Sequence, residues 1–138
     1  MSAPTFTAMR EALAAALDTV AGVRAYSHFP EKVNAPAAIV GGPSATYNDS
    51  TMTDEYTIPV LVLVADSSDR TAQLNLDSYL NPTGSTSIRA AIENDPKLGG
   101  VVETLYVTAL HDYGVHELNA IRYMGAMLDV VVIVDRWT

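Results

Sequence analysis

The chain has 138 residues, 49% of them hydrophobic and only 17% charged, which fits one domain over residues 1–138 with part of its apolar surface covered by other chains. Sixteen acidic against eight basic residues give a formal net charge of −8, which argues against a surface that grips nucleic acid by displacing counterions. The absence of cysteine excludes disulfides, thiolate metal sites and cysteine nucleophiles, and no apolar run approaches the ~20 residues that span a bilayer, so we expect no membrane partner.

An amphipathic helix is the first predicted element. From Phe6 on, apolar residues recur at spacings of three or four, which places them on one helical face: Met9, Leu13, Leu17 and Val20. Thr5 or Thr7 is expected to cap the start of this helix, and Gly22 is expected to end it in a left-handed conformation.

Three strands are predicted next. Short apolar runs bracketed by glycine and proline predict strands at residues 23–26 and 37–41. Residues 52–65 predict a long strand with two environments, because its first half alternates whereas residues 60–64 are continuously apolar, as in a strand covered on both faces. Pro59 has no N–H to donate, so we expect an edge or a bulge there.

Two helices are predicted in the middle of the chain. Residues 66–69, Asp-Ser-Ser-Asp, supply a cap and first-turn negative charge for a helix with an apolar face made of Ala72, Leu76, Tyr79 and Leu80. Residues 81–84 stop this helix. A shorter helix starts at Ser87 and ends before the Asp-Pro pair at 95–96, because the residue before a proline disfavours helical geometry.

Two long strands, residues 101–112 and 120–137, are predicted at the end of the chain, with a connection at 113–119. In the last strand one face is apolar from Met124 to Val134, and the other face, free to meet a neighbour, contains Tyr123, Met127, Asp129 and Asp135. The element order α, β, β, β, α, α, β, β predicts an α+β fold: a mostly antiparallel β-sheet with an N-terminal helix and two central helices packed on it. The predicted core includes Leu13, Leu17, Val62, Leu63, Val130 and Val132.

The candidates for chemistry are few. His111 and His116, with Asp112 and Glu117 nearby, have residue types suited to a metal or acid/base site. Five positions apart on a strand, however, the two histidines lie on opposite faces, and the tip of a hairpin explains their position without chemistry. Residues 66–69 contain serine and carboxylates, but helix capping explains them, and the glycine turns lack phosphate-loop spacing. We therefore predict no catalytic residue, no metal and no cofactor.

Several stretches carry a resemblance to a known family. In chain order they are 23–26 (VRAY) with Pro30, 36–41 (PAAIVG), 54–60 (DEYTIPV) leading into 63–64, 68–70 (SDR) with 76–80 (LDSYL), 87–93 with 98–100 (LGG), 113–115 (YGV) and 123–126 (YMGA). Together, in this order and spacing and over nearly the whole chain, they resemble the tail terminator proteins of long-tailed (siphovirus-type) actinobacterial bacteriophages.

The resemblance implies a structural virion protein without enzymatic activity. Such a subunit forms a homo-oligomeric ring, usually a hexamer, on the head-proximal end of the tail tube, stops tube polymerisation and docks to the head-side connector. Its partners are then copies of itself, the major tail tube protein and a head-side connector or stopper protein. It is assembled in the host cytoplasm and located at the head–tail junction of the virion. Six chains carry 6 × (−8) = −48 charges, so genome DNA is expected to pass without specific binding.

Two alternatives remain open from the sequence. One is another head-to-tail connector or tail-completion subunit, which is distinguished by whether the protein caps tail tubes. The other is a non-phage binding domain or a small enzyme, for which a close cluster of His111 with Asp and Ser is the discriminating feature. If the chain is a subunit of an assembly, its interface residues are expected in two protruding segments, 49–56 and 113–119, and on the outer face of the last strand. These residues are Asp49, Thr51, Met52, Asp54, Tyr56, Tyr113, His116, Glu117, Tyr123 and Met127.

Overall fold

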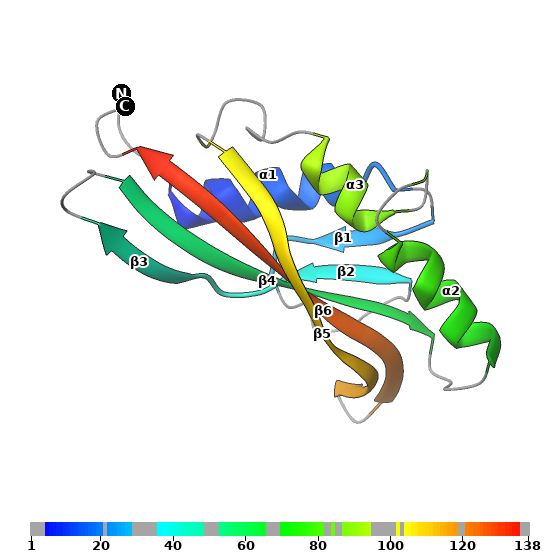
Figure 1. The fold of residues 1–138 in the computed structure, drawn as a ribbon. Helices are drawn as coiled ribbons and strands as arrows, with labels where there is room; N and C mark the ends of the chain where they lie inside the picture. Colours follow the sequence, from blue (N-terminus) through cyan, green and yellow to red (C-terminus); the bar gives the residue numbers. More distant parts are fainter. Residues whose placement is uncertain are drawn as a thin grey trace.

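The computed structural model of the chain describes residues 5–20, 22–28, 36–48, 53–65, 70–81, 84, 87–94, 102, 104–118 and 121–135. The elements are α1 (Phe6–Leu17), β1 (Arg24–Tyr26), β2 (Ala37–Val40), β3 (Ser44–Asn48), β4 (Thr53–Ala65), α2 (Arg70–Leu80), α3 (Ile88–Glu93), β5 (Thr104–Leu118) and β6 (Ile121–Asp135). The six-stranded sheet has the order β1-β2-β4-β6-β5, with β3 also paired to β4 (Figure 1). Only the β1–β2 pair is parallel among the described strands, so the predicted α+β fold is confirmed.

The main core lies between the sheet and the three helices, which pack on one face of it (Figure 1). This face of the sheet is apolar because alternate residues of each strand point to the same side. All six residues predicted for the core are buried: Leu13, Leu17, Val62, Leu63, Val130 and Val132.

Helix α1 is flanked by polar cap residues, Thr5 and Asp18. Thr5 is the N-cap, and its hydroxyl accepts a hydrogen bond from the Ala8 N–H at 3.0 Å, as expected for one of the two candidate threonines. The helix ends at Leu17, before Gly22, which has the expected left-handed conformation with a φ of 82°. Between them the chain tightens: the N–H of Val20 donates to the carbonyl of Leu17, three residues back. The capping role expected of residues 66–69 for α2 lies outside the described residues.

Strand β4 is covered on both faces over residues 60–64, as its continuous apolar run predicts. Val60, Val62 and Val64 point into the main core. Leu61 and Leu63 point to the opposite face, where they join a second buried cluster. The other buried members of this second cluster are Ala37, Ile39 and Tyr123.

The edge or bulge predicted at Pro59 is present on one side of β4, where residues 41–43 lie opposite residues 58–59 between two partner strands. Strand β3, the second of these partners, was missed by the sequence reasoning. β4 is an interior strand whose pairing with β6 is regular from Thr53 to Leu63. On its other side, β2 ends opposite Val60 and β3 starts opposite Thr57. The carbonyl of Pro59 faces this junction, where it accepts a hydrogen bond from the Gly41 N–H at 2.7 Å. The missing N–H of Pro59 therefore faces a break between two partner strands, where no ladder bond is lost.

The predicted connection at residues 113–119 is wrong for the part that the structure describes, residues 113–118. β5 continues to Leu118, which pairs with Ile121, and the strand accommodates its polar, glycine-containing segment by register shifts after Val107 and after His111. The positive φ angles of Asp112 (56°) and Gly114 (152°) fall in the second irregularity. β-bulges insert extra residues without ending a strand, and they bend it.

Replacing Ser87 by alanine is expected to lower the free energy of unfolding by about 1–2 kcal/mol. Ser87 is the N-cap of α3; its buried hydroxyl accepts from the Ala90 N–H at 3.0 Å and donates to the carbonyl of Asn81. Both partners lose their bond in the alanine variant. Urea denaturation checks the expectation, with Ser44→Ala on an exposed part of β3 as the control. Equal urea midpoints for the Ser87→Ala and Ser44→Ala variants contradict the capping role of Ser87.

Candidate functional site

The β5–β6 hairpin carries most of the exposed large hydrophobic side chains of the described chain. β5 is an edge strand of 15 residues, and both hairpin strands curl at their connected end (Figure 1). Among the described residues, eight large hydrophobic side chains are exposed, and five of these belong to the hairpin: Tyr106, Leu110, Tyr113, Val115 and Ile121. Long edge strands with exposed apolar residues are templates for association, so this hairpin is the candidate interaction surface.

Leu110 and Val115 lie on the face of the sheet that forms the main core. They pair across the strands with Leu128 and Met124, which are buried, and cross-strand partners point to the same face. Leu110 is nevertheless 49% exposed and Val115 is 53% exposed. On β5 this apolar face is therefore only partly covered within the described chain.

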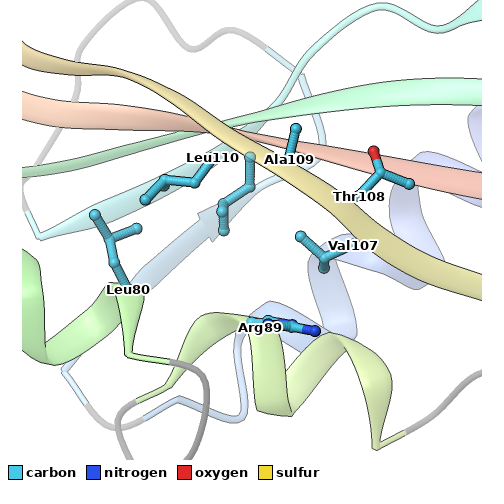
Figure 2. Close-up of a pocket in the computed structure, with 7 residues that line it drawn as sticks. Leu80, Arg89, Val107, Thr108, Ala109 and Leu110 are labelled. Atoms are coloured by element: carbon cyan, nitrogen blue, oxygen red, sulfur yellow. The ribbon is translucent and has the colours of Figure 1, made fainter.

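A pocket of about 270 Å³ lies where β5 passes α2 and α3. Its lining residues are Leu80, Arg89, Val107, Thr108, Ala109, Leu110 and Leu128 (Figure 2). Glu93 of α3 contacts two of the lining residues: its carboxylate accepts the Val107 N–H at 3.2 Å and pairs with Arg89 at 3.2 Å. The Val107 N–H, which points away from β6, is thus already bonded to Glu93. A further strand that pairs with the free edge of β5 therefore has to do so at other residues.

Of the interface residues expected in the long strand, the two that the structure describes are not on the surface. Asp54 and Tyr56 are buried on the helix side of β4, and the Tyr56 hydroxyl donates to Asp54 at 3.2 Å. The Tyr56 ring makes edge contacts with Phe6 and Tyr47, with centroid distances of 5.1 and 6.5 Å. Phe6 and Tyr47 are the exposed aromatic groups at this end. Asp49, Thr51 and Met52 lie outside the described residues.

The expected interface residues of the hairpin fall into two groups. Tyr113 and Glu117 are exposed, whereas Tyr123 is buried in the second cluster and Met127, half-buried, packs against it. His116 is half-buried, pairs across the strands with Tyr123 and contacts the carbonyl of Asp112 through Nε2 at 2.6 Å. The structure therefore brings His116, Tyr123 and Met127 to one face of the hairpin.

Tyr113 ties the hairpin to helix α2. Its hydroxyl donates to the Asp77 carboxylate at 2.8 Å. Partial burial is the first cause that raises the pKa of Tyr113 above its usual 10.0, and the bond to Asp77, which favours the neutral phenol, is the second. Sequence reasoning selected Tyr113 as a contact residue but had no signal for this long-range bond.

His111 lies between two carboxylates. Its Nδ1 contacts Asp112 at 2.9 Å and its Nε2 contacts Asp129 on β6 at 3.0 Å. The hydrogen bond to Asp129, followed by the one to Asp112, raises the pKa of His111 above its usual 6.5. A serine nucleophile needs one imidazole nitrogen to take its proton, but both nitrogens here face carboxylates. This arrangement is an ion-pair bridge between strands and differs from a catalytic triad.

Among the described residues, no group of three or more His, Cys, Asp and Glu side chains is arranged to hold a metal ion. Within the same part of the chain, no helix is long and apolar enough to cross a membrane. Comparison of the chain with protein-family models and with curated proteins gave no match.

Proposed function

We propose that this chain is a structural subunit of a bacteriophage tail, a tail terminator that closes into a ring on the head-proximal end of the tail tube. The observation that carries the proposal is the long β5 edge with its uncovered apolar residues, because it gives a single chain a surface suited to another chain. The resemblance of the sequence to tail terminators supplies the identity of the assembly.

A ring requires two different, complementary surfaces on each subunit. The sheet has two different sides: β5 forms one edge, and on the far side of β6 and β4 the edge strands are β1, beyond β2, and the exposed β3 (Figure 1). Such a head-to-tail contact closes when its rotation divides a full turn, and six copies are the number implied by the resemblance. The low proportion of charged residues, 17%, also suits a chain with surfaces buried by neighbours.

In this proposal the protein works by shape and has no enzymatic activity, metal or cofactor. Binding to the last ring of the major tail tube protein stops polymerisation, and the opposite face of the ring binds the head-side connector or stopper protein. The net charge of −8 per chain keeps the channel from holding the genome, since few cations are available to displace counterions from DNA.

The double variant Leu110→Ser/Val115→Ser is expected to assemble poorly while keeping its fold. Both side chains are about half exposed in the single chain, so their replacement removes apolar contact area from a neighbour without opening the core. Each truncation at an interface costs about 1–2 kcal/mol, so the dissociation constant is expected to rise by roughly 30-fold or more. Size-exclusion chromatography with light scattering, over a dilution series, measures it.

Leu74→Ser is the matched control, because Leu74 is 56% exposed but lies on α2 instead of β5. The control is expected to assemble as the wild type does. Circular dichroism and melting temperature establish that all variants fold. Tyr113 and His116 are less suitable targets, since they also hold the hairpin through Asp77 and Asp112. Unchanged assembly of the folded double variant contradicts the role assigned to the β5 edge.

A further inference from the structure

We propose that His111 is a protonation switch: its imidazolium form clamps the irregular segment of β5 at Asp112 onto β6 through Asp129, and loss of the proton releases this clamp. The proposal concerns a single chain and does not rest on the proposed function. It assigns a conformational role to His111, whose side chain is neither part of the hydrophobic core nor one of the exposed apolar residues of β5.

The clamp follows from the two contacts of one ring. Nδ1 reaches the Asp112 carboxylate at 2.9 Å, and Nε2 reaches the Asp129 carboxylate at 3.0 Å. An imidazolium has two N–H groups, so it donates to both carboxylates at once. A neutral imidazole has one N–H and one lone pair, which then faces carboxylate oxygen across the second contact. Only the protonated ring satisfies both contacts.

The surrounding charges favour the proton. Among the described residues, the titratable groups that contact His111 are Asp112 on its own strand and Asp129 on β6, both acidic. On the other side of β6, the residue paired with Asp129 is Pro59 of β4, which carries no charge. Asp77 of α2, the acidic residue of that helix that contacts this part of β5, is hydrogen-bonded to Tyr113. The pKa of His111 is accordingly raised, first by the bond to Asp129 and then by the bond to Asp112.

The backbone at the clamp has a conformation that is uncommon for residues other than glycine. Asp112 has a φ of 56°, the one positive φ among the described non-glycine residues. The segment is held from both sides: the Asp112 side chain contacts His111, and its carbonyl contacts His116 Nε2 at 2.6 Å. The register shift between His111 and Gly114 sets where Val115 and His116 point. Release of His111 therefore loosens the curled end of the hairpin.

The direction of the pH dependence follows from the raised pKa. The stabilisation from the clamp is complete below about pH 6.5, the ordinary pKa of histidine, and is lost as the pH rises through the higher pKa of the folded chain. The curled end of the hairpin is thus expected to be most ordered in mildly acidic solution and to loosen above the folded pKa.

NMR titration of the full chain from mildly acidic to mildly basic pH tests the switch. His28, His111 and His116 are the three histidines to be assigned. The His111 ring is expected to titrate above pH 6.5, and the backbone amides of residues 112–116 are expected to shift with the same midpoint. After correction for intrinsic exchange, hydrogen exchange of these amides is expected to accelerate several-fold above that midpoint.

Two variants separate the clamp from a simple charge effect. Asp129→Asn is expected to lower the His111 midpoint and to uncouple it from the amides of residues 112–116, because one anionic partner is gone. His111→Gln is expected to fold and to remove the pH dependence of those amides, whereas His28→Gln, outside the hairpin, leaves it unchanged. A His111 midpoint at or below 6.5, or amides of residues 112–116 that do not respond to it in the wild-type chain, overturns the proposal.

Discussion

Leu17→Ala is expected to lower the free energy of unfolding by about 2–5 kcal/mol, a large part of the 5–15 kcal/mol that is typical of a domain. Leu17 is fully buried at the end of α1, within the cluster that joins the helices to the sheet. Truncation to alanine removes apolar contacts and leaves a cavity, since a helix held at several points along its buried face collapses only partly into the space.

The matched control for this variant is Leu74→Ala. It makes the same chemical change in a helix, but at a side chain that is 56% exposed. Its effect on the free energy of unfolding is expected to stay within about 0.5 kcal/mol. Urea denaturation of both variants, with the slope compared to that of the wild type, measures the difference. A Leu17→Ala chain as stable as Leu74→Ala means that α1 does not pack on the sheet.

Gly125→Ala is expected to destabilise the fold by about 1–3 kcal/mol, because a methyl group has no room at this position. A Cβ on Gly125 meets the carbonyl oxygen of Val62 and lies 2.8 Å from Leu63 Cδ2. The Val62 contact is with backbone, which shifts only by moving β4 away from β6. The ring of His116 also lies over this site, at 3.4 Å from the added atom. The glycine thus allows the close approach of three segments.

Gly42→Ala provides the control, because a Cβ on Gly42 meets nothing within 4 Å. Its melting temperature is expected to match that of the wild type or to exceed it slightly, since alanine restricts the unfolded chain. Thermal unfolding followed by circular dichroism compares the two variants. Equal melting temperatures for Gly125→Ala and Gly42→Ala contradict the close packing of β4 on β6.

Much of the fold is predictable from the sequence because periodicity reports burial. The spacing of Leu13 and Leu17 gives the helix, and the continuous apolar run at residues 60–64 gives a strand covered on both faces. β3 has no such signal: its residues, Ser-Ala-Thr-Tyr-Asn, are exposed where burial is assigned and carry no apolar pattern. Its position depends on pairing with β4, which is a long-range interaction.

The candidate surface was only partly predictable. The sequence predicts the two strands of the hairpin, but it also predicts a connection at 113–119, because Gly114 and its polar neighbours interrupt the alternation of a strand. A bulge keeps such a segment in the ladder, and a single sequence does not distinguish a bulge from a turn. The contacts of His111 with Asp129 and of Tyr113 with Asp77 join residues 18 and 36 positions apart, which spacing rules do not reach.

Ring formation is the central claim, and native mass spectrometry of the purified full chain, combined with negative-stain electron microscopy, tests it most directly. The proposed ring predicts closed particles with a central opening and, for six chains of 14.7 kDa, a mass of 6 × 14.7 = 88.2 kDa. The same ring is predicted at the head-proximal end of isolated tails that contain the protein. A 14.7 kDa monomer both in solution and in those tails contradicts the claim.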